Sequence, residues 1–148
     1  MGVNRHVSRI TSMQQWIVPY APTLWATGAM GSLLLVQLLV VDLASIKARH
    51  RPGTPIEVDH GKFLFRATRA HANTNESIAA FILLALFAVL SAASAGWLNA
   101  LSWAYVVARV AHMLFYYAGL QLLRSIAFGA GLAALFGMFF VGLSPWVS

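Results

Sequence analysis

Four long apolar segments occupy most of this 148-residue chain and leave little room for any other structure. We expect helical spans over residues 23–46, 62–93, 97–119 and 122–141. A helix of about 20 residues rises about 30 Å, which is enough to cross the hydrocarbon layer of a bilayer. Only 9% of the residues are charged, against about 25% in soluble domains. The sequence therefore predicts an all-α integral membrane protein, an antiparallel bundle of four transmembrane helices in a single domain over residues 1–148.

The distribution of lysine and arginine around these spans predicts the orientation of the chain. We expect residues 1–15, which are polar and basic, to form an arm outside the membrane. The second connection has no basic residue. The first connection has Lys47, Arg49, Arg51 and Lys62, and the third has Arg124. Cytoplasmic loops carry an excess of such residues, so we expect the first and third connections to face the cytoplasm, against a weaker signal from Arg5 and Arg9. We expect a multi-pass protein of a bacterial inner membrane.

Composition argues against several classes of function. The net charge is +6, but the spans leave no room for a soluble nucleic-acid module, so we expect no nucleic-acid partner. We attribute about half of the basic residues to contacts with anionic lipid. Without cysteine the chain has no disulfide and no cysteine nucleophile, and a bound ligand must supply any thiol. His71 and His112 form no HxxxH or HExxH pattern, so we expect no metal site.

The start of the second span is unusually polar for a membrane helix. Residues 65–81 read FRATRAHANTNESIAAF. Four of these residues follow one another at spacings of three, four and three: Arg66, Arg69, Asn73 and Glu76. On a helix they lie within an arc of about 80°, whereas His71 and Asn75 point elsewhere. A charged stripe inside a membrane is costly unless it faces protein, a cavity or a ligand.

This stripe has two interpretations. Glu76 could pair with Arg69 or Arg109 in a purely structural network that holds the helices together. Asp42, in the first span, could likewise pair with Arg66. Arginines nevertheless outnumber acids inside the bundle, and surplus positive charge in a partly buried place favours an anionic ligand.

The third span carries a second polar stripe. Its members are spaced four, three and four residues apart: Tyr105, Arg109, His112 and Tyr116. They share one helix face within an arc of about 60°. Tyr117 lies beside them, and Arg124 and Ser125 follow the turn that we expect at Gly119. Aromatic residues alone at this spacing would indicate packing, whereas an arginine and a histidine among them favour a functional site.

These two stripes resemble the signature of a known family. The run RAHANTNE, residues 69–76, resembles the Arg-Ala-x-x-Asn-x-x-Glu motif of the membrane-associated proteins in eicosanoid and glutathione metabolism, the MAPEG family. The run RVAHMLFYYAGLQLLRS, residues 109–125, is similar to the family's Arg-x-x-His-x-x-x-Tyr motif with its later Arg-Ser pair. The resemblance extends to the four-span layout and points to the microsomal glutathione transferase and prostaglandin E synthase branch.

The resemblance implies a four-helix protomer that assembles as a homotrimer. It also implies glutathione as co-substrate, bound between neighbouring protomers near the cytoplasmic side. The positions that match glutathione-binding or site-supporting residues of the family are Arg69, Asn73, Glu76, Arg109, His112, Tyr117 and either Arg49 or Lys47. The positions that match its catalytic residues are Arg124, which would stabilise the thiolate, Ser125 and Tyr116. Both Tyr116 and Tyr117 fit the tyrosine of the third-helix motif.

These residue types suit glutathione, which carries two carboxylates, an ammonium group and a thiol. Arginines bind carboxylates through paired charge-assisted hydrogen bonds, and a glutamate suits the ammonium. A free thiol has a pKa of about 8.5, which an adjacent cation lowers. We therefore expect a glutathione-dependent membrane transferase or peroxidase that acts on lipophilic electrophiles reaching the site from the bilayer. The alternatives are a glutathione-assisted lipid isomerase and a non-catalytic membrane scaffold or accessory subunit.

Overall fold

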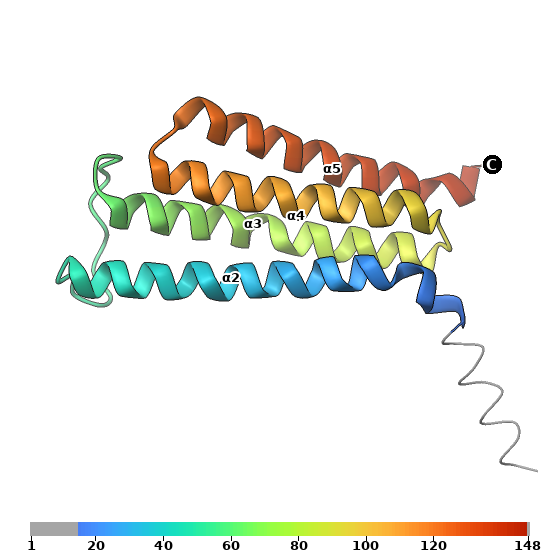
Figure 1. The fold of residues 1–148 in the computed structure, drawn as a ribbon, viewed down its shortest axis with the longest axis horizontal. Coiled ribbons are helices and arrows are strands. Elements are labelled where there is room, and N and C mark those ends of the chain that lie inside the picture. The colour runs from blue at the N-terminus through green and yellow to red at the C-terminus, as the bar shows by residue number, and fades with distance from the viewer. Residues whose placement is uncertain (1–14, 148) are drawn as a thin grey trace, which may run out of the picture.

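The computed structural model describes residues 15–147, which form an all-helical bundle. A short 3-10 turn, η1 (Val18–Tyr20), leads into α2 (Ala21–Lys47). Three further long helices follow: α3 (Phe63–Leu90), α4 (Ala95–Ala118) and α5 (Gln121–Val147). The helices run alternately up and down along one common direction (Figure 1).

All four helices have the length and composition of membrane spans. This finding confirms the predicted all-α bundle of four transmembrane helices. Their outer faces carry large exposed apolar side chains, which suit contact with lipid; Leu35 and Leu39 on α2 and Phe136 and Phe140 on α5 are examples. The arm expected over residues 1–15 lies almost wholly outside the described residues.

Proline and glycine account for two of the helix ends. Pro22 stands in the first turn of α2, where the missing N–H would have had no partner within the helix. Gly119 follows α4 in the left-handed conformation, with φ 75°, which glycine adopts without steric cost. Because the chain reverses over residues 119–120, α5 packs back against α4.

The fourth helix runs to the end of the described chain, well beyond the predicted end at residue 141. Pro145 lies in its last turn and has no N–H to donate to the carbonyl of Val141. The hydroxyl of Ser144 donates to that carbonyl instead, at 2.8 Å. The indole N–H of Trp146 donates to the hydroxyl of Ser91, just after α3, also at 2.8 Å. These two side-chain bonds explain why the proline does not end the helix.

The middle of the bundle is formed by α3 and α4, each of which contacts both α2 and α5. Fully buried apolar side chains from all four helices build the core: Met30, Phe81, Leu98 and Met138. Since the helices alternate in direction, the end of α2, the start of α3, the end of α4 and the start of α5 lie at one end of the bundle (Figure 1). The polar residues of α3, α4 and α5 are thereby brought together.

Candidate functional site

A small polar cavity lies among α3, α4 and α5, at the end of the bundle where α4 ends and α5 begins. Its volume is about 220 Å³, and it is lined by Asn73, His112, Tyr116, Arg124, Ser125 and Phe128. We call it the Arg124 cavity. All of its lining residues except Phe128 are among those that the sequence predicts for the site, so the fold gathers residues from both motifs.

Arg124 lies in the first turn of α5 and covers the ring of Tyr116. The central carbon of its guanidinium is 4.3 Å from the centre of that ring. Attraction between a cation and an aromatic face holds the group in place and leaves the N–H edges free to donate. Arg124 is half-buried and has no carboxylate within salt-bridge distance among the described residues. It is therefore a positive charge that no described acid neutralises and that is available to an anion.

His112 is almost completely buried, with 2% of its surface exposed. Its ring lies edge-on to Tyr116, with the ring centres 5.2 Å apart, and 6.2 Å from the ring of Phe128. Its Nδ1 atom is buried and has no hydrogen-bond partner within residues 15–147. His112 thus packs between two aromatic rings and keeps one ring nitrogen unused.

The two hydroxyl groups of the cavity differ in what they can donate. The hydroxyl of Ser125 donates to the carbonyl of Gln121 in its own helix, at 3.1 Å. In this rotamer it can accept hydrogen bonds from a ligand, but its proton is already used. The hydroxyl of Tyr116 makes no hydrogen bond to the described residues, so its proton is free for a ligand. Tyr116 is therefore the better placed hydroxyl donor of the pair.

Arg109 lies behind the cavity and does not line it. It is 1% exposed, and one of its terminal nitrogens donates to Asn73 Oδ1 at 2.7 Å and to Thr74 Oγ1 at 3.2 Å. Both acceptors are neutral, so no full negative charge contacts this buried cation. Its direct partner is thus the cavity residue Asn73, and its contact with a ligand stays a prediction.

The polar stripe of α3 divides in the folded chain. Arg66 donates to two carbonyls of the preceding loop, at 2.7 and 2.8 Å, and so fastens that loop to the helix. Arg69 and Glu76 are exposed on the surface of α3. They lie within about 60° of Asn73 around the helix, and neither lines the Arg124 cavity. Of the four residues, Asn73 alone lines it.

The ion pairs that a structural network would require do not form within the described chain. Residues 15–147 contain one ion pair, which joins Lys62 to Glu57 in the loop. Glu76 makes no ion pair with an arginine among residues 15–147, and Asp42 is exposed on α2. No acid or base among residues 15–147 neutralises these charges, which lie on spanning helices.

The remaining tyrosines lie away from the Arg124 cavity. Tyr105 is buried, stacks on Phe81 with ring centres 4.7 Å apart, and shares a 2.7 Å hydrogen bond with Ser77. Tyr117 packs edge-on against Phe63 near the start of α3, with the ring centres 5.4 Å apart. Among the described residues, therefore, Tyr116 is the tyrosine beside Arg124, and the ligand contact of Tyr117 stays a prediction.

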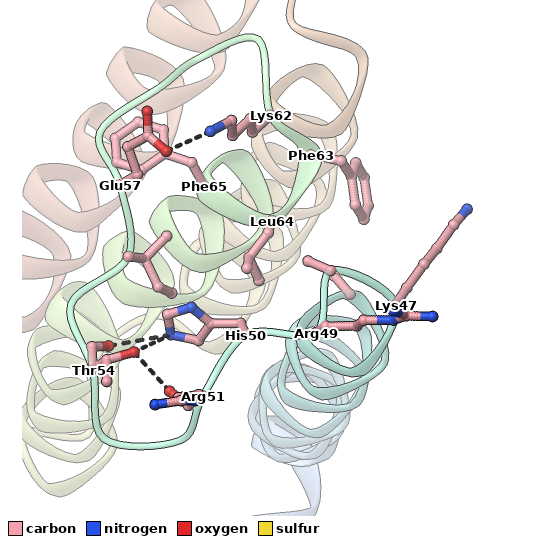
Figure 2. A pocket seen from close by; sticks show the side chains of 13 residues that line it. Lys47, Arg49, His50, Arg51, Thr54, Glu57, Lys62, Phe63, Leu64 and Phe65 are labelled. Carbon is pink, nitrogen blue, oxygen red and sulfur yellow. Dashed lines mark hydrogen bonds and ion pairs between the residues drawn. The ribbon is translucent and has the colours of Figure 1, made fainter.

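A larger cavity, of about 660 Å³, lies between the end of α2, the connecting loop and the start of α3 (Figure 2). Arg49, predicted as a glutathione contact, lines this loop cavity and not the Arg124 cavity. Its side chain extends to one side together with Lys47, while Arg51 extends to the other (Figure 2). The cationic groups do not converge on one point, so the loop cavity is not a built anion site. In the described chain, Arg49 and the Arg124 cavity are separate features.

Two buried residues near the site are absent from the sequence-based set. Gln37 on α2 and Thr74 on α3 are fully buried, and Gln37 Nε2 donates to Thr74 Oγ1 at 3.2 Å. The signal for Gln37 is present in the sequence, since it is a lone amide within the apolar run LLLVQLLVV. Thr74 has no such signal, because threonine often bonds its own helix, as it does here to the carbonyl of Ala70.

A family model described as the MAPEG family matches residues 22–144, which cover nearly all of the four helices. No curated protein matches the chain. The family match spans most of the chain, includes every residue of the Arg124 cavity, and supports a glutathione-related function in a membrane. The chain is a member of the MAPEG family.

Proposed function

We propose that this protein is a glutathione-dependent membrane transferase or peroxidase that acts on lipophilic electrophiles. The observation that carries the proposal is the Arg124 cavity, where a fixed guanidinium stands beside Tyr116 and no carboxylate lines the wall. Such a site attracts an anion. Family membership makes glutathione the first candidate, and its two carboxylates outnumber its single ammonium group.

Each polar part of glutathione finds a suitable residue in this proposal. Arg69 binds one carboxylate through its guanidinium fork, and Glu76 binds the ammonium group. Asn73 bonds a peptide or carboxylate oxygen. Arg124 and the hydroxyl of Tyr116 stabilise the thiolate, and each unit by which they lower the thiol pKa corresponds to about 1.4 kcal/mol of differential stabilisation. Arg49 is assigned to the second carboxylate, from a neighbouring protomer.

The proposed reaction requires no nucleophile from the protein. The thiol gives its proton to water beside Arg124. The sulfur lone pair then forms a bond to an electrophilic carbon, while the leaving group departs with its bonding electrons. With a hydroperoxide, the sulfur attacks the terminal oxygen, the O–O bond breaks and an alcohol is released after protonation. A second glutathione then converts the sulfenic acid to a disulfide and water. The chain contributes proximity and electrostatic stabilisation.

We also propose a homotrimer in which a neighbouring protomer completes the site. The Arg124 cavity holds about 220 Å³, less than the roughly 300–1,000 Å³ usual for small-molecule sites. Arg69 and Glu76 on α3 and Asp42 on α2 are exposed in the single protomer. A charged side chain facing hydrocarbon costs about 2.5–3.5 kcal/mol on insertion scales. A neighbouring copy that covers these charges would remove the cost and enlarge the cavity.

An apolar groove offers the electrophile a route from the bilayer. It has a volume of about 390 Å³ and is lined by Ala80, Leu84, Leu132, Leu135, Phe136 and Phe139 of α3 and α5. Ala80 lies on the same face of α3 as Asn73, and Leu132 on the same face of α5 as Phe128. The apolar groove and the Arg124 cavity therefore follow one another along the α3–α5 interface. A lipophilic substrate in the groove would bring its reactive end toward the thiolate.

Glutathione binding to the purified, assembled protein tests the proposal. Calorimetry should detect binding at or below millimolar glutathione, and the protein should accelerate conjugation of chlorodinitrobenzene. A glutathione analogue with a methyl group in place of the thiol should bind but not react. Absence of binding at millimolar glutathione contradicts the proposed function and favours the accessory-subunit alternative. Product analysis with an endoperoxide lipid separates an isomerase from a transferase.

A further inference from the structure

A buried chain of hydrogen bonds connects α2 to the Arg124 cavity. Gln37 Nε2 donates to Thr74 Oγ1 at 3.2 Å, and an Arg109 terminal nitrogen donates to the same oxygen at 3.2 Å. That arginine nitrogen also donates to Asn73 Oδ1 at 2.7 Å. Gln37, Thr74 and Arg109 are each 1% exposed or less, whereas Asn73 is half-buried and lines the cavity. This series of hydrogen bonds therefore runs from the protein interior to a residue that a ligand can touch.

The hydroxyl of Thr74 uses its full hydrogen-bonding capacity in this chain. It donates its proton to the carbonyl of Ala70 at 3.1 Å, and its two lone pairs accept from Gln37 and Arg109. A hydroxyl has one proton and two lone pairs, so no other arrangement serves all three partners. Gln37 must consequently present its NH2 group to Thr74. Its Oε1 atom is left buried and without a partner among the described residues.

The orientation of Asn73 is set in the same way. An arginine side chain has donors but no acceptor, so the atom of Asn73 that faces Arg109 must be the amide oxygen. The other end of the amide is then an NH2 group. It has no hydrogen-bond partner among residues 15–147 and is not among the buried unsatisfied atoms. This NH2 group is therefore free and accessible.

We propose that Gln37, Thr74 and Arg109 form a positioning relay that holds the Asn73 amide with its oxygen turned inward and its NH2 group turned toward the Arg124 cavity. The relay deepens the proposed function, on which the identity of the ligand rests. With Asn73 and Arg124 both donating, the cavity selects a ligand that presents acceptor oxygens or a thiolate on this side. Gln37, Thr74 and Arg109 are positioning residues, because among the described residues they reach the cavity only through Asn73.

Replacing Asn73 by aspartate separates the positioning role from a merely structural one. In Asn73→Asp one carboxylate oxygen keeps the bond to Arg109 and gains a full charge, so the ligand-free protein should unfold at the same or a higher temperature than wild type. The second oxygen now faces the cavity as an acceptor that repels anions. Glutathione binding should weaken by about tenfold or more. Asn73→Ala, the control, loses the Arg109 bond and should unfold at a lower temperature.

A double-mutant cycle tests whether Gln37 acts through Asn73. Gln37→Met keeps the length of the side chain and removes the donor to Thr74, and should weaken glutathione binding by about two- to tenfold. In the Asn73→Asp background, where the NH2 group no longer exists, the same substitution should have no further effect on binding. Equal effects of Gln37→Met in both backgrounds would overturn the relay.

The stability and binding measurements separate the two proposals. If Asn73→Asp binds glutathione as tightly as wild type, or is destabilised as strongly as Asn73→Ala, the relay is wrong. If wild type itself does not bind glutathione, the proposed function is wrong. The relay is then judged on unfolding temperatures alone. A clearly higher unfolding temperature for Asn73→Asp than for Asn73→Ala supports the relay, and an equal or lower one overturns it.

Discussion

Replacing Arg124 by alanine should abolish the thiolate absorbance, at about 240 nm, that we predict for the proposed glutathione complex, and should leave the assembled protein intact. Among residues 15–147, the guanidinium of Arg124 is the one cation that lines the cavity. Without it the thiol returns toward its ordinary pKa of about 8.5, so little thiolate exists at neutral pH. The rate of conjugation should fall by a factor of about 10²–10³, as when one electrostatic donor is removed from an enzyme site.

Two variants serve as controls for this result. Arg124→Lys keeps the charge but loses the planar group that stacks on Tyr116, and should retain part of the thiolate signal. Arg66 lies at the same end of the bundle, and its side chain bonds two loop carbonyls. Arg66→Ala should therefore leave the thiolate signal unchanged. A full thiolate signal in Arg124→Ala would assign the stabilising role to another group.

Replacing Arg69 by methionine should weaken glutathione binding by about 10- to 100-fold, the usual loss when a hydrogen bond to a charged group is removed. Arg69 is exposed and has no ion pair among residues 15–147, so the chain should fold without it. Calorimetry measures the affinity, and size-exclusion chromatography in detergent measures the assembly.

Glu76→Gln is the companion variant, because it removes the charge proposed to bind the ammonium group and keeps the shape of the side chain. It should also weaken binding and leave assembly intact. If both variants instead abolish assembly, and the wild type shows no dependence on glutathione, the two charges hold protomers together and the protein is an accessory subunit.

The apolar segments of the sequence predict the four-helix architecture, because the thickness of the bilayer sets the length of a span. The predicted first three spans lie close to α2, α3 and α4. The end of α5 was not predictable, since Pro145 normally argues for a helix end. Its effect is offset by Ser144 and by the bond of Trp146 to Ser91, a residue more than fifty positions earlier.

Helical periodicity identifies the correct faces of α3 and α4 but not the distances between them. It places Arg109 and His112 on one stripe, yet His112 lines the cavity whereas Arg109 lies behind Asn73. Periodicity also groups Arg66 with Asn73, although the side chain of Arg66 reaches back to the loop. Long arginine side chains bond whatever acceptor the tertiary structure brings near, and sequence spacing carries no information about that choice.

The relay from Gln37 to Asn73 could not be derived from one chain segment, because its members belong to α2, α3 and α4. A lone glutamine in an apolar span predicts a buried polar partner. The identity of that partner depends on the rotation of α2 against α3, which packing decides. The same applies to Tyr116 and Tyr117, neighbours in sequence that face Arg124 and Phe63 respectively.

The central claim is that the cavity at the loop end of the bundle binds glutathione with its sulfur beside Arg124. An electron cryo-microscopy structure of the assembled protein in glutathione tests this claim most directly. We predict an elongated, peptide-like density that contacts Arg69 and Glu76 and places its sulfur next to Arg124 and the hydroxyl of Tyr116. A lipid headgroup at this position, or an empty cavity at saturating glutathione, would contradict it.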